Sequence, residues 1–139
     1  MGTWHRMTIR VRYTEADPMG RLHHSVYAIY FELGRTELMR ERGLSHAAME
    51  AAGRFIAIAG LECRFKAAAR YDDVLVIETS VREVRGARVV FENRVLRAGA
   101  DGDTLIAEGT VTGALVDAAG RPKRFSPEEA AALTDAGAA

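Results

Sequence analysis

The chain has 139 residues, which is the usual length of one domain and is enough to bury a hydrophobic core. Basic and acidic residues balance at 19 each, so the composition lacks the strongly basic character of many nucleic-acid-binding proteins. A single cysteine, Cys63, excludes an intramolecular disulfide and any metal site built from several cysteines. No apolar run is long enough to cross a bilayer, and we expect a soluble, cytoplasmic protein without membrane insertion.

The first patterned segment alternates between apolar and polar residues. Its apolar members are Met7, Ile9, Val11 and Tyr13. A period of two is typical of a strand with one buried face, so we predict a strand over residues 7 to 13. Tyr13 is then expected to end the strand on its inner face.

A turn and a long helix follow this strand. The run Asp17-Pro18-Met19-Gly20 has the residue preferences of a type I turn. From about Ser25 to Arg42, apolar residues recur at helical spacing, with Gly43 as the stop. We expect the N-terminal half of this helix to be buried and its C-terminal half to emerge into solvent. The core-facing stripe comprises Tyr27, Tyr30, Phe31, Gly34 and Leu38, widened by Val26, Ile29 and Leu33.

The remainder of the chain predicts strands and two short helices. Ser45 can cap a helix over residues 46 to 52, and Ser126-Pro127-Glu128-Glu129 begins another over about 126 to 136. Between them, alternation predicts four strands: a first from Arg54, then Val74 to Val84, Val89 to Arg97 and roughly Thr104 to Val116. In the first, one face would hold Phe55, Ala57, Ala59, Leu61, Cys63 and Phe65.

These elements together predict an α+β fold in a single domain spanning residues 1–139, with a core over about 7–118. A five-stranded antiparallel sheet, whose last four strands form a meander, wraps around the long central helix, which is the hot-dog fold. Gly109 and Gly113 would lie on the inner face and allow the helix to approach closely. The outer face would still carry Ile56, Ile58, Val76 and Val90, so we expect a partner subunit there, in a homodimer or homotetramer.

Several motifs occur together in this sequence: the run Asp17-Pro18-Met19-Gly20, His24, Tyr27, Tyr30-Phe31-Glu32, Arg35-Thr36-Glu37 and the segment from Ala69 to Leu75. They resemble the 4-hydroxybenzoyl-CoA thioesterase family of hot-dog proteins. The resemblance implies hydrolysis of an acyl thioester, usually of coenzyme A, at a site shared across a dimer interface and without a metal or redox cofactor. It also implies Asp17 as nucleophile or general base, and the backbone N–H at His24 as the group that polarises the carbonyl. Because the 4-hydroxybenzoyl-specific enzymes carry Tyr where His24 stands, the chain resembles the short-chain or broad acyl-CoA branch instead.

Each candidate site residue also has a structural interpretation. Asp17 is either catalytic or the first residue of a turn, and His24 is either a second general base or a histidine satisfied near the helix cap. Tyr13 either positions the substrate or Asp17, or belongs to the core. Tyr27, Tyr30 and Phe31 either line an acyl pocket, with Gly20 of the turn also contacting substrate, or pack against the sheet.

Other residues and other functions stay open at this point. Glu32 is either a carboxylate of the site or a partner of Arg35, while His23 is expected at the surface and Cys63 as an apolar filler. The phosphates of coenzyme A require cations, for which Arg85 and Arg88, or Lys123 and Arg124, are candidates. Alternatives to a thioesterase are a non-catalytic acyl-CoA binding protein and a hot-dog enoyl-CoA hydratase or dehydratase.

Overall fold

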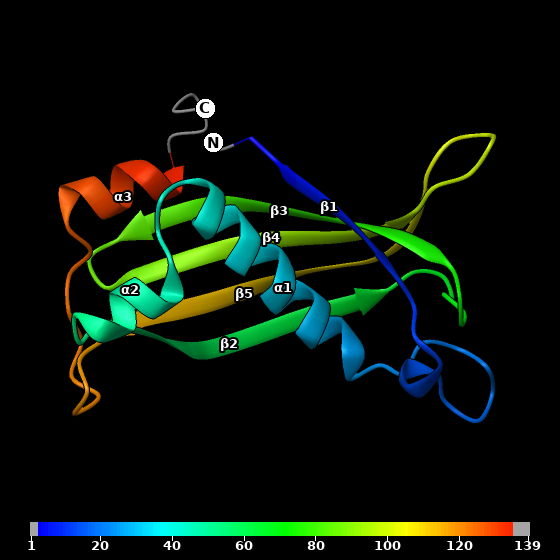
Figure 1. The fold of residues 1–139 in the computed structure, drawn as a ribbon, viewed down its shortest axis with the longest axis horizontal. Coiled ribbons are helices and arrows are strands. Elements are labelled where there is room, and N and C mark those ends of the chain that lie inside the picture. Colours follow the sequence, from blue (N-terminus) through cyan, green and yellow to red (C-terminus); the bar gives the residue numbers. More distant parts are fainter. Residues whose placement is uncertain (1–2, 135–139) are drawn as a thin grey trace.

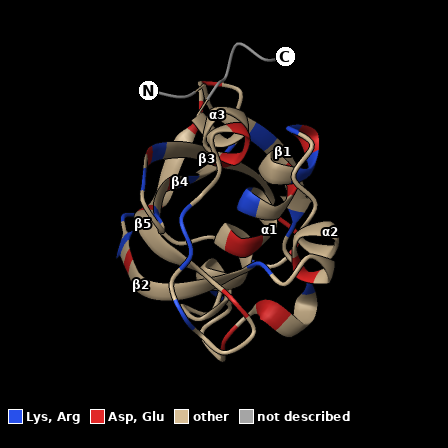
Figure 2. Ribbon diagram, turned by 90° about the vertical axis from the view of Figure 1, so that its left-hand side faces the viewer, with Lys and Arg blue, Asp and Glu red and all other residues tan. Residues whose placement is uncertain are grey.

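The structure is a computed structural model, and it describes residues 3–134. The chain forms β1 (His5–Arg10), a single 3-10 turn η1 (Tyr13–Glu15), α1 (Val26–Glu41), α2 (His46–Ala51), β2 (Phe55–Phe65), β3 (Val74–Arg85), β4 (Arg88–Arg97), β5 (Thr104–Val116) and α3 (Pro127–Thr134). The five strands form one antiparallel sheet, and α1 lies across it (Figure 1). Seen end-on in Figure 2, the strands curve around α1, which confirms the predicted hot-dog fold. None of the described helices combines the length and apolar content needed to cross a membrane.

The strand order differs from the predicted meander. The sheet runs β1-β3-β4-β5-β2, so only β3, β4 and β5 follow one another as neighbours. After α1 and α2 the chain enters the sheet at its far edge, where β2 pairs with β5 instead of β3. As a result β1 and β2 are the two edge strands, and α1 lies over the face between them (Figure 1).

An irregularity within β2 reverses the predicted faces of its first half. Ile58 pairs with Gly113 but Gly60 pairs with Thr112, so Ala59 is an extra residue on β2. A one-residue slip moves every preceding side chain to the opposite face. Ile56 and Ile58 therefore face the helix, and the prediction that they lie outside is wrong. Leu61, Cys63 and Phe65, beyond the bulge, share the helix side as predicted.

The outer face of the sheet is not the apolar surface expected from the sequence. Val76 and Val90 are buried within the chain itself. Arg94 stacks on Trp4, with 4.0 Å between the guanidinium carbon and the ring centroid, and both Arg6 and Arg94 pair with the buried Glu78. Acidic and basic side chains cover the neighbouring strands on this face, including Glu62, Arg64, Arg82, Glu92 and Glu108.

The central helix is buried along one stripe over its whole length. Leu38 and Met39 near its C-terminal end are as fully buried as Phe31, whereas Ile29 and Leu33 are 49% and 39% exposed. The expectation that the N-terminal half is inside and the C-terminal half outside is therefore wrong. A straight helix lying along a sheet buries a stripe of side chains, and the opposite stripe stays exposed regardless of its hydrophobicity.

Glycines bring α1 into close contact with the sheet. A Cβ atom at Gly34 would lie 2.3 Å from Oγ1 of Thr79 and 3.0 Å from a methyl group of Ile77, both on β3. At Gly109 of β5, a Cβ would lie 3.0 Å from the ring of Phe31, so the close approach predicted there is confirmed. At Gly113 the nearest atoms belong to β2 and β4 and not to the helix.

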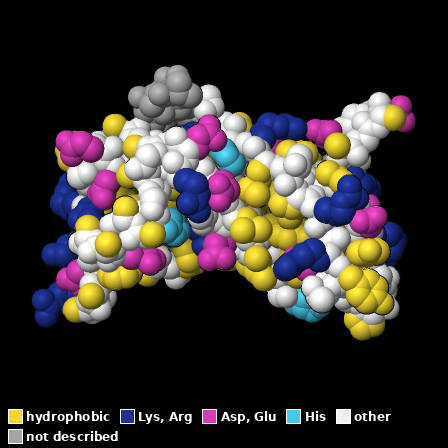
Figure 3. All heavy atoms as spheres, in the orientation of Figure 1, with side chains coloured by type: hydrophobic (Ala, Val, Ile, Leu, Met, Phe, Trp, Pro, Cys, Tyr) yellow, Lys and Arg dark blue, Asp and Glu magenta, His cyan; other side chains and the backbone are white. Residues whose placement is uncertain are grey.

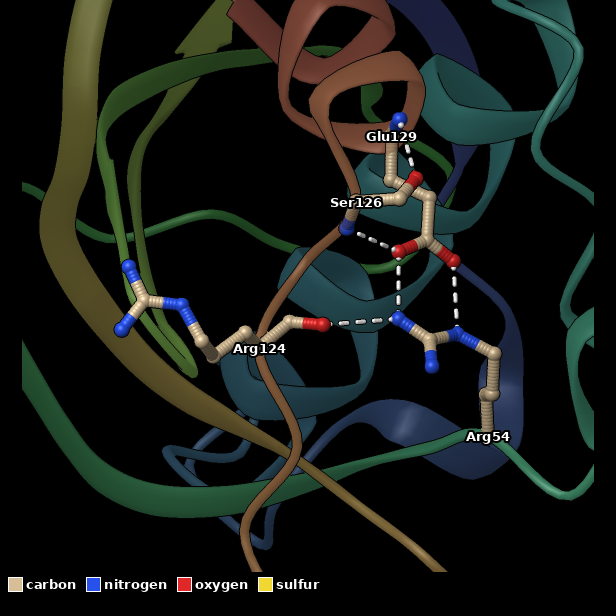
Figure 4. Close-up of polar contacts among 4 residues, drawn as sticks. All are labelled: Arg54, Arg124, Ser126 and Glu129. Atoms are coloured by element: carbon tan, nitrogen blue, oxygen red, sulfur yellow. Dashed lines mark hydrogen bonds and ion pairs between the residues drawn. The ribbon is translucent and has the colours of Figure 1, made fainter.

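The C-terminal helix α3 begins with the predicted capping box. The hydroxyl of Ser126 accepts a hydrogen bond from the Glu129 N–H at 3.0 Å, and the Glu129 carboxylate accepts one from the Ser126 N–H at 2.8 Å (Figure 4). Arg54, just before β2, donates two further bonds to this carboxylate and one to the Arg124 carbonyl. These Arg54 bonds lower the pKa of Glu129 despite its partial burial. The predicted helix over 126 to 136 is described only as far as Thr134.

Replacing Gly34 by Ala should destabilise the protein. The new methyl group would overlap Thr79, and overpacking of this kind costs about 1 to 3 kcal/mol, against a gain of about 1 kcal/mol in helix propensity. Chemical denaturation of G34A should show a net loss. Gly60→Ala is the matched control, because the nearest side-chain atom lies 4.0 Å from its added Cβ. A G34A protein as stable as the G60A protein would contradict the close approach.

Glu129→Gln should destabilise the protein by about 1 to 3 kcal/mol at neutral pH, since it removes charge-assisted hydrogen bonds from Arg54. The folded pKa of Glu129 is lowered from its ordinary value of 4.5, so its contribution is present above that pH and is lost as the pH falls through the lowered value. Unfolding free energies of the two proteins should therefore converge in acid. A difference independent of pH would contradict this assignment.

Candidate active site

The loop that carries Asp17 is a tight hairpin between η1 and α1. Oδ1 of Asp17 accepts hydrogen bonds from the backbone N–H groups of Met19 at 2.8 Å and Arg21 at 3.1 Å. Gly20 has φ +78° and donates its N–H to the Asp17 carbonyl, so a left-handed residue is required there. The second carboxylate oxygen, Oδ2, accepts no hydrogen bond from the residues between 3 and 134. One oxygen therefore shapes the turn while the other is available.

The same turn occurs a second time in the chain. Oδ1 of Asp117 accepts from the N–H groups of Ala119 and Arg121, both at 2.9 Å, and Gly120 again has a positive φ. The structural interpretation of Asp17 as the first residue of a turn is thus confirmed. The turn accounts for one oxygen of each aspartate and does not by itself distinguish Asp17 from Asp117.

A buried carboxylate holds the Asp17 loop against α1. Glu15 is almost completely buried and accepts hydrogen bonds from the Arg12 N–H at 2.8 Å and the Tyr30 hydroxyl at 2.9 Å. Burial opposes ionisation of Glu15, but the bonds from Arg12 and Tyr30 outweigh it and lower its pKa. The Glu15 carbonyl also accepts the His23 N–H at 2.9 Å. Both ends of the loop are therefore tied to one residue.

The chain enters α1 through two stacked histidines. The rings of His23 and His24 lie 4.2 Å apart, and Nδ1 of His23 accepts the Ser25 N–H at 3.1 Å. The Val26 N–H donates to the His23 carbonyl, whereas the His24 N–H donates to no group within the described part of the chain. A free donor at the positive end of a helix is suited to bind an oxygen that gains negative charge.

Asp17 and His24 line the same cleft, which has a volume of about 340 Å³. Tyr27 and Phe65 form part of its wall, with their rings 5.2 Å apart and edge to face. Burial, aided by Cys63, raises the pKa of Tyr27 to about 12, so its phenol is neutral. The remaining lining residues are Arg21, Leu22, Lys66, Ala67 and Ala68.

Three other candidates lie elsewhere. Tyr13 does not end a strand on the inner face, because β1 ends at Arg10 and the chain then folds into η1. Its side chain is 79% exposed and contacts Tyr71 edge to face. Tyr30 and Phe31 are buried in the core under the sheet, as the structural interpretation of these residues expected, and neither lines the cleft.

Arg85 and Arg88 are far from Asp17 within one chain. They flank the hairpin between β3 and β4, whereas the Asp17 loop bridges to Arg70, just before β3 begins. At about 3.3 Å per residue, the twelve residues of β3 separate the two ends by roughly 40 Å. Sequence reasoning did not select the two cations that do line the cleft, Arg21 and Lys66. The proximity of Arg21 to Asp17 was the available signal.

Glu32 and Cys63 were also singled out from the sequence. Glu32 forms no ion pair with Arg35 among the described residues and attracts it only at longer range. Cys63 is half-buried on the helix side of β2, and burial raises the pKa of its thiol. Between residues 3 and 134 there is no cluster of three or more His, Cys, Asp or Glu side chains able to hold a metal ion.

Comparison with known proteins places this geometry in a family. A profile of the thioesterase-like superfamily matches residues 11–133. The acyl-CoA thioester hydrolase YbgC of Escherichia coli is 32% identical over 115 residues, which cover 83% of this chain and 84% of the relative. A hypothetical protein from Thermus thermophilus has a TM-score of 0.84 at 34% identity, covering 92% of this chain and 95% of that one.

A more distant structure supports the fold. A 4-hydroxybenzoyl-CoA thioesterase bound to 4-hydroxybenzoyl-CoA has a TM-score of 0.86 at 20% identity, covering 94% of this chain and 99% of the other. This likeness concerns the fold alone, but it agrees with the resemblance noted in the sequence. The profile match and the E. coli relative both extend over most of the chain, and the chain therefore belongs to the thioesterase-like superfamily of hot-dog proteins.

Proposed function

We propose that this protein hydrolyses acyl-CoA thioesters, with Asp17 as general base or nucleophile and the start of α1 as the site that polarises the carbonyl. Membership of the thioesterase-like superfamily and the acyl-CoA thioester hydrolase relatives support the reaction. The observation that carries the assignment of residues is the cleft shared by Asp17 and His24, in which Oδ2 of Asp17 has no partner among the described residues.

The proposed chemistry needs two groups. The free oxygen of Asp17 attacks the carbonyl carbon or accepts a proton from the attacking water, and the coenzyme A thiolate departs. The N–H of His24 donates to the carbonyl oxygen as it becomes anionic, and one donor of this kind lowers the barrier by about 3 to 4 kcal/mol. Neither a metal nor a redox cofactor is required. The imidazole of His24, which also lines the cleft, is a second candidate base.

Arg21 and Lys66 are better placed than Arg85 and Arg88 to bind the phosphates of coenzyme A. Both line the cleft that contains Asp17. Lys66 also lies 3.7 Å from Glu108 in an exposed ion pair, whereas Arg21 has no acidic partner among the described residues. Arg21 is therefore the stronger candidate, and its guanidinium can bind a phosphate through two parallel hydrogen bonds.

We also propose a homodimer and a cytoplasmic location. The apolar side chains that support association lie between α1 and the edge strand β2, where Ile29, Ile58 and Leu61 are each nearly half exposed. Figure 3 shows apolar side chains at the surface along α1. The outer face of the sheet, where the sequence predicted a partner subunit, carries acids and bases instead of the expected apolar residues.

Asp17→Asn should abolish most of the thiol release from an acyl-CoA panel that runs from short aliphatic to long-chain and aromatic members. The amide keeps an oxygen for the N–H groups of Met19 and Arg21 but has no charge to act as base or nucleophile. We expect a fall in kcat of about 10²- to 10⁴-fold. Asp117→Asn is the matched control, because it changes the same turn at a distant position and should leave the rate unchanged.

The outcomes of this comparison separate the competing functions. Equal rates of thiol release by the D17N and D117N proteins would show that Asp17 only forms the turn and is not catalytic. Absence of thiol release from the native protein, combined with calorimetric binding of acyl-CoA, would favour a binding protein. Loss of enoyl-CoA absorbance without thiol release would favour a hydratase.

Arg21→Ala should raise KM for acyl-CoA about fivefold without changing kcat, which corresponds to the roughly 1 kcal/mol expected of an exposed ion pair. The effect should disappear with an acyl-pantetheine substrate, which lacks the phosphates of the nucleotide. Arg88→Ala should leave both substrates unaffected. An R21A effect of equal size on acyl-pantetheine would show that Arg21 shapes the loop and does not bind phosphate.

A further inference from the structure

Arg35 is a buried cation that, among the described residues, is attracted by Glu32 only at longer range. It lies on the stripe of α1 that contacts the sheet and is only 8% exposed. Within residues 3–134 it forms no hydrogen bond and no ion pair. Arg54, a guanidinium that is partly shielded from solvent, instead donates two hydrogen bonds to Glu129. A guanidinium keeps its charge in proteins, and a buried charge without an anion nearby is strongly disfavoured.

The surroundings of Arg35 form a self-contained patch. Arg35 lines a cleft of about 260 Å³ between α1 and β2, together with Glu32 and the apolar residues Ile29, Ile58 and Leu61. Glu32 is exposed and stands one turn before Arg35 on the same helix, yet it acts on Arg35 only at longer range. The patch thus contains one acid and one base that form no close ion pair with each other.

A patch of this composition is complementary to itself. A twofold axis places the same surface on both subunits, so residue i of one contacts residue j of the other and the reverse. Two copies would then bring two acids to two bases. The patch also borders β2, whose outer edge has no neighbouring strand among those described and can pair with a second chain. A free anion is a poorer occupant, because Glu32 would repel it from the same cleft.

We propose that Arg35 is neutralised by Glu32 of the partner subunit in a twofold dimer, and that the reciprocal pair forms on the other side of the axis. This inference rests on the homodimer proposed above but not on its catalytic activity. The pair gives Arg35 a close counter-ion and fixes how the two patches align, since a shift along the helix would separate both charges from their partners.

Charge reversal in each position tests the pair directly. The E32R protein would have two bases on the patch and the R35E protein two acids, so each should repel itself, with a dimer dissociation constant raised about tenfold or more. An equimolar mixture should form a heterodimer, because every base then faces an acid. A pair within one chain predicts no such rescue. Light scattering gives the mass, and native mass spectrometry separates the three possible dimers.

Control measurements keep the outcome interpretable. Glu128→Arg reverses an exposed charge on α3, outside the patch that holds Arg35 and Glu32, and should dimerise like the native protein. Circular dichroism must show that each variant is folded. If the R35E protein is not folded, the charge reversals are replaced by the neutral substitutions Glu32→Gln and Arg35→Met. The heterodimer of the E32Q and R35M proteins keeps one Arg35–Glu32 pair, and the two homodimers keep none. The fraction of heterodimer should therefore exceed the fraction expected from random pairing.

Three results would overturn the proposal: a native protein that stays monomeric, charge-reversed variants that dimerise as tightly as the native protein, or a mixture without excess heterodimer. Association is measured without substrate. Failure of the native protein to release thiol would therefore count against the proposed reaction and leave the pairing result unaffected.

Discussion

The contact between α1 and the sheet governs the rest of this structure. At Gly34 the helix backbone comes so near to Thr79 and Ile77 that no side chain fits between them, and Phe31 lies against the bare backbone at Gly109. Contacts of this kind fix both the height and the rotation of a helix, because packed interiors have few gaps into which atoms can move. The position of the first turn of α1, where the proposed chemistry takes place, follows from them.

The Asp17 loop has a structural role in the turn and a proposed role in the reaction. Asp17 and Asp117 make the same turn with the same backbone hydrogen bonds, so the turn alone does not create a site. What distinguishes Asp17 is its environment. Glu15 binds the loop to α1 through Tyr30, and Asp17 and His24 line one cleft beside it. Oδ1 of Asp17 holds the turn, and Oδ2 accepts no hydrogen bond from the described residues, so the turn does not occupy the oxygen proposed to react.

Local signals predicted much of the architecture. The capping box at Ser126, the stop at Gly43 and the hairpin after Arg85 depend on neighbouring residues, and the structure has helix or strand boundaries at each of them. The predicted position of Asp17 and His24 at the start of α1 is also local in origin, and they do share a cleft. Predictions failed where a distant segment decided the outcome. Tyr13 lies outside the core because the chain folds into η1, where the Tyr30 hydroxyl of α1 binds Glu15, and Ile58 changes faces because β2 has an extra residue where it pairs with β5.

By itself, then, the sequence determined the number and type of elements, the antiparallel sheet around a central helix and the loop that carries Asp17, since periodicity and turn chemistry act over a few residues. Only the tertiary structure decided that β2 joins the far edge, that Lys66 and not Arg85 lines the cleft of Asp17, and that Arg35 is buried without a close ion pair in the described part of the chain. Each of these depends on which strands pair and on where a helix comes to rest, and pairing between residues far apart in the chain leaves no trace in local spacing.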